Sequence, residues 1–305
     1  MSSAETTGEG LVGGETPSIR SRGPWARALR RFRRQPLAVA ALVLLLVIFG
    51  AGALATKVAP YGYSGYNLDA IPPLAPTRKG NHFFGTDEIG RDTFSRTLYG
   101  IRTSAEVSLS VAVLASLLGV LIGGLAGYYG GWIDNVLMRI VDFLVTIPAL
   151  VLLFTTIVYF GVPSPLKIGV ILTLYLWTAV ARVVRGSFAS LREAEYVEAA
   201  RAAGASDGRI ILRHLLPNAA GSIIVAATLL VGQVILLEST VEFFEYGIDQ
   251  NAVPSLGNLV ADSVKNEGLG SPWWWLYLMP ASFIVAMIMC VNFVGDSLDE
   301  ALNPR

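Results

Sequence analysis

The chain has 305 residues, of which 53% are hydrophobic and only 15% are charged, and its mean hydropathy is +0.55. A soluble domain carries about 25% charged residues, so this composition excludes a soluble core and a disordered chain and indicates a membrane protein. Because 23 basic residues balance 23 acidic ones, the charge gives no reason to expect a nucleic-acid partner. The single cysteine excludes a disulfide framework and a cysteine-based metal cluster, and the two histidines are far apart, so we expect no metal site.

The amino-terminal part consists of a basic tail and one apolar run. Residues 1–36 carry seven arginines, and the first 24 residues are rich in Ser, Gly, Thr and Glu, which is the composition of a disordered segment. Residues 37–56 are apolar over 20 positions, the length that a helix needs to cross a bilayer. Residues 53–55 resemble a signal-peptidase site, but a run this long is typical of an uncleaved anchor.

Five further stretches predict transmembrane helices. Four of them are long apolar runs, at residues 107–133, 143–166, 215–237 and 268–295. The third span is expected to stop near Phe160, because prolines follow, and Pro148 and Pro280 are expected to kink their spans. Residues 168–181 form a shorter run, which Arg182 and Arg185 can extend by reaching toward the membrane interface. The prediction is an all-α polytopic membrane protein with six transmembrane helices.

The distribution of basic residues predicts the orientation. With an even number of spans both termini lie on one side, and a cytoplasmic amino terminus places fifteen of the 23 Lys and Arg residues inside. We therefore expect cytoplasmic tails at 1–36 and 296–305, an extracytoplasmic loop at 57–104, and a five-helix core at 105–295. That core includes a cytoplasmic loop at 193–217.

This inner loop has the pattern of two short helices joined by a turn. Residues 194–203 are strong helix formers. One helical face of this segment is apolar, formed by Tyr196, Val197, Ala200 and Ala203. Gly204 suits the position that ends a helix, Ser206 or Asp207 can cap a second helix, and Pro217 suits the first turn of the fifth span. By composition alone, an ordinary amphipathic loop fits about as well.

The same residues carry a family resemblance. Glu198, Ala199 and Ala200, with Gly204 and the later Leu216-Pro217, resemble the EAA loop of ABC importer permeases. In that family this loop is the coupling helix that docks on a cytoplasmic ATPase. The resemblance implies ATPase-coupling roles for Glu195, Glu198, Ala199, Ala200, Gly204, Ser206 and Asp207. Glu198 would anchor the loop's fold or its docking, and Gly204 would permit the turn.

A second resemblance narrows the family to permeases of dipeptide and oligopeptide importers. Residues 82–104, together with 130–134 and 295–305, resemble the signatures of that branch. The extracytoplasmic signature residues are Gly85, Thr86, Asp87, Gly90, Arg91, Asp92, Ser95 and Arg96. The resemblance implies a type I ABC importer permease in the bacterial inner membrane. Its partners would be a homologous permease, two ATPase subunits that hold ATP and Mg²⁺, and an extracytoplasmic peptide-binding protein, with no cofactor on this chain.

Several charged residues have both a structural and a transport interpretation. Asp87, Arg91, Asp92, Arg96 and Arg102 could cap the entry side, but interspersed opposite charges favour a salt-bridge knot that fixes the loop against the second span. Asp142 is an acid within the membrane, which is a functional candidate by default. A pair with Arg139, three residues earlier, explains it without transport. The spacing of Gly119, Gly123 and Gly127 predicts close helix packing rather than a path lining.

The outer half of the fifth span contains our candidates for the translocation path, which are Gln233, Glu238 and Glu242. Where the family carries small and apolar residues after this span, the chain carries acids, including Glu245. These acids could gather at the outer mouth and favour cationic cargo. Pairing with outer arginines, or plain exposure, is the alternative.

The chain has no motif of an enzyme. No Walker A sequence, nucleophile elbow or His-Glu-x-x-His helix occurs in it, so we expect a transport subunit that works by alternating access. Closure of the ATPases would move residues 195–204, and the fifth span would transmit that shift through residues 210–217. The alternatives are the same machinery with another cargo, such as a nickel chelate or haem, a secondary transporter, or a membrane-embedded hydrolase.

Overall fold

The computed structural model describes residues 24–67, 69, 71, 73–161, 164–247, 253–267 and 272–302. Over these residues all the regular secondary structure is helical, apart from two isolated β-bridges, which confirms the all-α prediction. The predicted disordered tail falls outside the described residues. The helices are α1 Pro24–Phe32, α2 Pro36–Ala53, α3 Ala55–Val58, η2 Lys79–Asn81, α4 Thr93–Tyr129, α5 Gly131–Thr146, α6 Ala149–Phe160, α7 Pro165–Leu191, α8 Glu195–Ala202, α9 Asp207–Ile210, η3 Ile211–Leu215, α10 Leu216–Phe243, α11 Leu256–Glu267 and α12 Trp275–Leu302.

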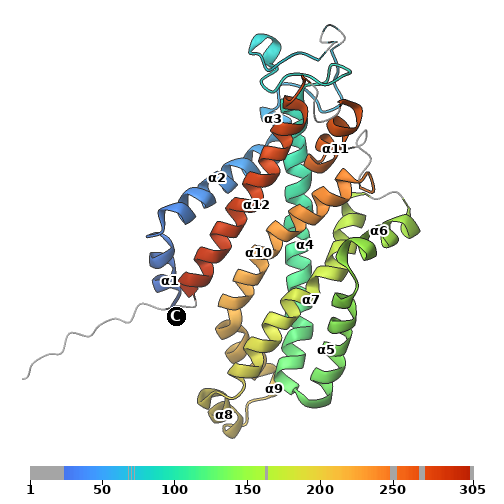
Figure 1. The fold of residues 1–305 in the computed structure, drawn as a ribbon. Helices are drawn as coiled ribbons and strands as arrows, with labels where there is room; N and C mark the ends of the chain where they lie inside the picture. The colour runs from blue at the N-terminus through green and yellow to red at the C-terminus, as the bar shows by residue number, and fades with distance from the viewer. Residues whose placement is uncertain are drawn as a thin grey trace, which may run out of the picture.

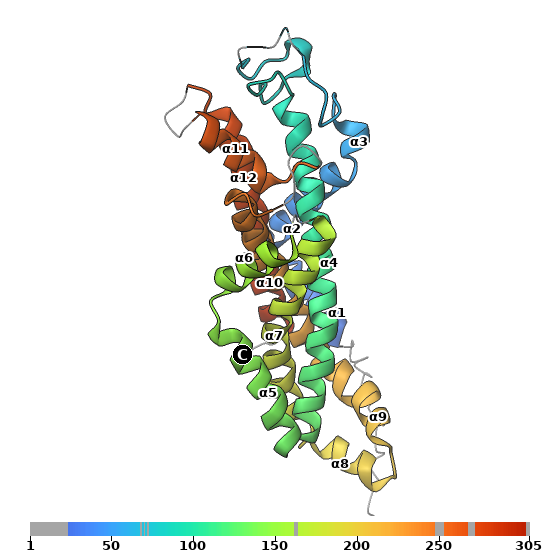
Figure 2. The ribbon, with the colours of Figure 1, turned by 90° about the vertical axis from the view of Figure 1, so that its right-hand side faces the viewer.

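The helices form an elongated bundle with a loop region at each end (Figure 1). In the described part of the chain, five helical segments are long and apolar enough to cross a membrane, and the bent pair α5–α6 makes a sixth if it counts as one span. The residues around η2, together with α11, lie at one end of the bundle, and α8 and α9 lie at the other (Figure 2). The functional candidates therefore divide between the two ends.

The second span is longer than its apolar run. Asp92 caps α4, and its carboxylate accepts the Ser95 backbone N–H at 2.7 Å. The helix continues for 37 residues, about 56 Å at 1.5 Å per residue, and a hydrocarbon core is only about 30 Å thick. Its end comes at Gly130, which has a φ of 64°. The predicted span at 107–133 therefore differs from the helix at both ends. The first turns of α4 carry polar residues that hydropathy does not count, and Gly130 ends the helix before residue 133.

The third span is broken rather than straight, which corrects the continuous run predicted at 143–166. Helices α5 and α6 meet at 85°. The bend lies at Ile147, which is extended with a ψ of 125°, and at Pro148, which is the N-cap of α6. Proline disfavours a helical conformation at the residue before it, so the helix stops there and a new one begins. The expected kink at Pro148 and the expected end at Phe160 are both confirmed.

The fourth span extends well past its 14-residue apolar run, as α7 continues to Leu191. Arg182 and Arg185 lie within this helix and hold it to α5. Arg182 donates to Asp142 at 2.8 Å, and Arg185 binds Asp134. The predicted pair of Asp142 with Arg139 is wrong, because the neighbouring helix brings Arg182 to that carboxylate.

Glycines let α4 and α7 approach closely, as their spacing predicted. A Cβ atom placed on Gly119 would lie 2.6 Å from Val180, and one on Gly127 would lie 2.6 Å from the Arg185 carbonyl oxygen. At Gly123 it would overlap the α7 backbone as well. Small residues allow this close helix contact in a membrane, so the glycine series is part of the packing of the bundle.

Candidate functional site

At one end of the bundle, α8 and α9 form the loop that the sequence singled out. Val197 and Ile210, one from each helix, are fully buried and join the main hydrophobic cluster. Ala200 is half-buried against the same cluster, but Tyr196 and Ala203 are exposed. The predicted apolar face is therefore correct for Val197 and Ala200 and wrong for the other two. The opposite face is exposed to solvent, and it carries Glu195, Glu198, Ala199 and Ala202.

The turn between α8 and α9 is a Schellman motif. Gly204 has a φ of 79°, its N–H donates to the Arg201 carbonyl at 2.9 Å, and the Ala205 N–H donates to the Ala200 carbonyl at 3.0 Å. A side chain at this φ would be strained, so the predicted helix-ending role of Gly204 is confirmed. Ser206 is the N-cap of α9 by its backbone, but neither it nor Asp207 supplies the expected capping bond.

Asp207 instead binds a residue that sequence reasoning did not identify. The Tyr128 hydroxyl, in the last turn of α4, donates to Asp207 Oδ1 at 2.6 Å. The Arg201 guanidinium of α8 lies over the Tyr128 ring, 5.6 Å from its centre. Tyr128 therefore contacts both halves of the loop and fixes them against the bundle. No local pattern signals this role, since 79 residues separate Tyr128 from Asp207.

The loop continues directly into the fifth span. A π-helical turn, Ile211–Leu215, joins α9 to α10, and the whole segment Asp207–Phe243 is one 37-residue spanning helix. Pro217 lies in the first turn of α10 and has no N–H to donate to the carbonyl four residues earlier. The π-helical turn therefore lies directly before this proline. The predicted connection between loop and span is confirmed.

At the opposite end of the bundle, the signature residues form a salt-bridge knot. Asp87 accepts from Arg91 Nε at 2.6 Å and from Arg96 Nη1 at 2.8 Å. Arg96 is only 3% exposed and also lies 4.0 Å from Asp262 of α11. The structural interpretation of these charges is thus confirmed. Arg102 does not belong to the knot, because it pairs with Glu106 on the exposed side of α4.

Backbone geometry explains several of the other signature residues. Gly85 and Gly90 have φ values of 74° and 79°, and a Cβ at either would overlap a neighbouring carbonyl. The Thr86 hydroxyl accepts the Leu74 N–H at 2.8 Å, and the Ser95 hydroxyl accepts the Tyr61 N–H at 3.2 Å. The signature therefore serves to fold the loop.

Asp92 connects the loop to α4 through a second buried residue. While one of its oxygens caps α4, the other lies 2.9 Å from His82 Nδ1. His82 is 3% exposed and stacks on Tyr61 with a ring separation of 5.1 Å. His82 begins the stretch 82–104 that carries the family resemblance, but the sequence alone assigned it no contact.

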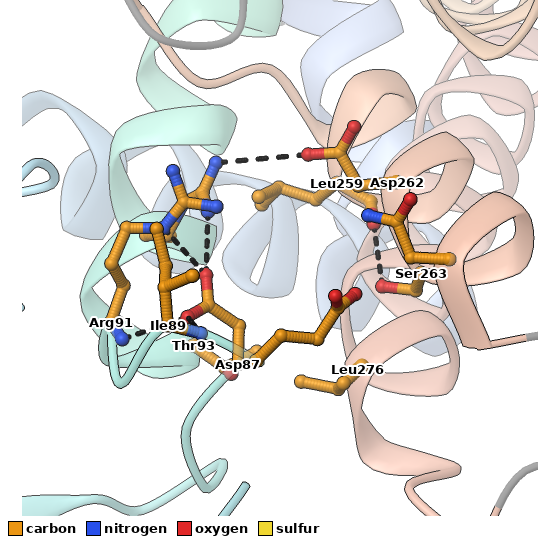
Figure 3. A pocket seen from close by; sticks show the side chains of 11 residues that line it. Asp87, Ile89, Arg91, Thr93, Leu259, Asp262, Ser263 and Leu276 are labelled. Carbon is orange, nitrogen blue, oxygen red and sulfur yellow. Dashed lines mark hydrogen bonds and ion pairs between the residues drawn. The ribbon is translucent and has the colours of Figure 1, made fainter. Parts of the chain in front are cut away.

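A polar cavity of about 240 Å³ lies between the signature loop and α11. Figure 3 shows Asp87 and Arg91 on one side and Leu259, Asp262 and Ser263 on the other. Three acids and two arginines line it, and two of the acids, Asp87 and Asp262, lie beside the arginines, so the cavity has no strong excess of either charge. The described residues contain no cluster of His, Cys, Asp or Glu that could hold a metal ion.

The acids of the fifth span do not gather at an open mouth, which corrects that prediction. Glu238 and Glu242 are each 1% exposed. Glu238 accepts from the Ser104 hydroxyl of α4 at 3.0 Å, and Glu245 is paired with Lys265 at 2.6 Å. Of the three path candidates, Gln233 alone has an exposed side chain.

Comparison with known proteins decides the family. Residues 119–305 match the family described as binding-protein-dependent transport system inner membrane component. The chain belongs to this family. As a member, it is a multi-pass membrane permease subunit of an ABC importer rather than an enzyme, and it works in a complex with other transporter subunits. Its residues 23–76 also match the N-terminal TM domain of oligopeptide transport permease C.

Individual permeases of this family align over nearly the full chain. The oligopeptide transport system permease protein OppC of Escherichia coli K12 is 37% identical over 95% of this chain and 94% of its own. The dipeptide transport system permease protein DppC of Bacillus subtilis 168 is 39% identical over 91% of this chain and 85% of its own. OppC of Mycobacterium tuberculosis H37Rv is 35% identical over 90% of this chain and 93% of its own.

A solved structure agrees on the fold. A chain of the MetNI methionine ABC transporter in an inward-facing conformation superposes with a TM-score of 0.54, at 20% identity. The match covers 67% of this permease and 94% of that chain. The likeness supports the ABC importer permease fold and carries no information on cargo.

Proposed function

We propose that this chain is one of two permeases in an ABC importer of dipeptides and oligopeptides. The second permease would be a homologue, two ATPase subunits would bind ATP and Mg²⁺, and an extracytoplasmic protein would deliver the peptide. The support for this cargo is that relatives from three bacterial species, each aligned over 90% or more of this chain, have names that specify oligopeptides or dipeptides.

We propose that both termini lie in the cytoplasm, with residues 57–104 outside and the core at 105–295. The arginines around α1 favour this orientation. It places α8 and α9 in the cytoplasm and the salt-bridge knot outside, where the knot and α11 would form the surface that receives the binding protein.

The observation that carries the mechanism is the continuity of α9, η3 and α10. A 37-residue helix begins in the exposed loop and crosses the bundle. A shift of α9 can therefore reach the outer half of α10 through one continuous helix. The turn at Gly204 and the contacts of Tyr128 with Arg201 and Asp207 would tie α8 to α9. The exposed face of α8 would dock on an ATPase, where the small Ala199 permits close approach and Glu195 and Glu198 supply charge.

The outer half of α10 would open and close the path. Gln233 is exposed on this helix and would face the path between the two permeases. Glu238 and Glu242 would contribute by holding α10 to its neighbours, since Glu238 binds Ser104 of α4 and Glu242 packs against Gly257 in the first turn of α11.

The turn at Gly204 gives the test of coupling. Gly204→Val forces a β-branched residue to a φ of 79°, so we expect the loop to lose its shape, peptide uptake to fall at least tenfold, and ATPase subunits to co-purify poorly. Membrane insertion should be unchanged on immunoblots. Gly186→Val is the matched control, because Gly186 is a helical glycine with open space around it. Normal uptake by the Gly204 variant would contradict the assignment of the loop.

The cargo needs a separate experiment. A strain that lacks this gene should lose growth on dipeptides and oligopeptides as the sole source of a required amino acid, and the restored gene should return it. If growth on peptides is unaffected while a nickel chelate or haem is no longer taken up, the cargo proposal is wrong and the coupling proposal stands.

A further inference from the structure

A dense group of arginines surrounds the turn between α1 and α2. All of its members have exposed side chains, and they are Arg27, Arg30, Arg31, Arg33 and Arg34. No acidic residue occurs between positions 24 and 58. Across the described parts of the chain, none of the ion pairs between side chains involves these arginines. Their positive charge is therefore available to a ligand.

The fold holds this group in place. On the other face of α1, Ala28 and Phe32 are each 7% exposed and join a hydrophobic cluster with Cys290 and Val294 of α12. Gln35, in the turn, donates to Glu300 of α12 at 2.7 Å. Figure 1 shows α1 beside the end of α12. Because α1 is anchored along its apolar face, the arginines project from a fixed support rather than from a loose tail.

The arginines line a cavity of about 250 Å³. The lining residues are Ala26, Arg27, Arg30, Arg31 and Arg34. A guanidinium group binds phosphate oxygens through two parallel N–H donors, so a cavity with four guanidinium groups and no carboxylate suits a phosphate.

An apolar groove begins at the same turn and follows α2. It has a volume of about 660 Å³. Arg33 and Pro36 form its start, and Val39, Ala40, Val43 and Val47 continue it. From Pro36 to Val47 the helix rises about 16 Å at 1.5 Å per residue, which is close to half of the roughly 30 Å hydrocarbon core. The groove therefore has the length of one acyl chain in a single leaflet.

We propose that the α1–α2 junction binds one anionic phospholipid, with its phosphate among the arginines and one acyl chain along the groove of α2. Charge complementarity selects an anionic headgroup. A zwitterionic headgroup would bring its own positive charge to a junction that already contains five arginines. The apolar groove selects a lipid over free phosphate, because free phosphate would leave the groove unfilled. Basic clusters next to a membrane span attract anionic lipids by this physical effect.

The test measures lipid adducts on the purified full-length permease, with any subunits that accompany it, by native mass spectrometry. We expect phosphatidylglycerol to bind at least tenfold more tightly than phosphatidylcholine. The triple variant Arg27→Gln, Arg31→Gln, Arg34→Gln should weaken the binding of phosphatidylglycerol about 100-fold. The reason is that each basic residue near a lipid surface raises the affinity by a factor of about five. The corresponding triple Lys variant should stay within about tenfold of wild type, and it keeps the charge that orients the first span.

Two further variants separate the parts of the site. Ala40→Trp fills the groove and leaves the arginines intact, and it should weaken the binding of phosphatidylglycerol. Lys57→Gln, Arg78→Gln, Lys79→Gln removes three charges elsewhere and should bind the lipid like wild type. The proposal is overturned if phosphatidylcholine binds equally well, if this control loses as much binding as the arginine variant, or if inorganic phosphate displaces the lipid while Ala40→Trp has no effect. It is also overturned if Ala40→Trp expels the second permease and leaves lipid binding unchanged, since a protein would then occupy the groove.

Discussion

The contact of Tyr128 with Asp207 gives the sharpest test of how the loop of α8 and α9 is held. The Tyr128 hydroxyl at the end of α4 donates to the Asp207 carboxylate at 2.6 Å. Tyr128→Phe removes this single oxygen and keeps the ring, so the contact with Arg201 remains. The variant therefore isolates one bond between the bundle and the loop.

The expected magnitude follows from the burial of the two partners. A hydrogen bond to a charged group contributes about 1.5–3 kcal/mol when it is shielded from water. Tyr128 is only 6% exposed, but Asp207 has an exposed side chain, so we take a smaller contribution of about 1–2 kcal/mol, around the lower end of that range. This corresponds to a factor of about 5–30 in the equilibrium between docked and released loop.

Hydrogen–deuterium exchange of the purified permease measures that equilibrium directly. In Tyr128→Phe, we expect the backbone amides of residues 195–210 to exchange about 5–30 times faster, with peptide uptake reduced at unchanged membrane levels. Asp207→Asn should weaken the same bond. The double variant Tyr128→Phe, Asp207→Asn should add little to the effect of the tyrosine change alone, because the two substitutions remove one shared interaction.

Tyr129 provides the matched control. It is the next residue on α4 and is 47% exposed, and no hydrogen bond of its hydroxyl occurs within the described residues. Tyr129→Phe should leave both exchange and uptake at wild-type levels. If Tyr128→Phe behaves like Tyr129→Phe, or if the double variant is additive, then Tyr128 does not hold the loop.

Two further substitutions test the packing and the outer knot by thermal unfolding in detergent. Gly123→Ala places a methyl group into the α7 backbone and should lower the free energy of unfolding by about 1–3 kcal/mol. Gly50→Ala, in open space on α2, should be neutral or stabilising. Equal unfolding midpoints for the two variants would contradict the close α4–α7 contact. Asp87→Ala leaves Arg96, which is 3% exposed, without its nearest carboxylate and should cost about 3–5 kcal/mol. Glu106→Ala breaks an exposed pair and should cost less than about 1 kcal/mol, so a similar loss in both would show that the knot is not buried.

Sequence patterns predicted the features that depend on neighbouring residues. The helix-ending role of Gly204 follows from a helix-forming run that must stop. Hydropathy found the spans for the same reason, since an apolar run is a local property. It misplaced their ends where polar residues extend a helix, as at α4 and α7.

Contacts between distant segments could not be predicted in this way. Asp142 was assigned to Arg139 because that residue is near in sequence, while the structure brings Arg182 from α7, two helices further along the chain. Glu238 was placed at an open mouth, because a linear pattern does not show that α4 covers it with Ser104.

Composition and apolar runs alone predicted a helical membrane protein, and the two motifs predicted the permease family and a coupling loop on its arginine-rich side. The tertiary structure decided which groups meet: Tyr128 with the loop, Arg96 with Asp87, and the arginines of α1 with a groove on α2. The physical reason is that hydropathy and backbone preference act over a few residues along the chain, whereas hydrogen bonds and ion pairs depend on distances that only helix packing sets.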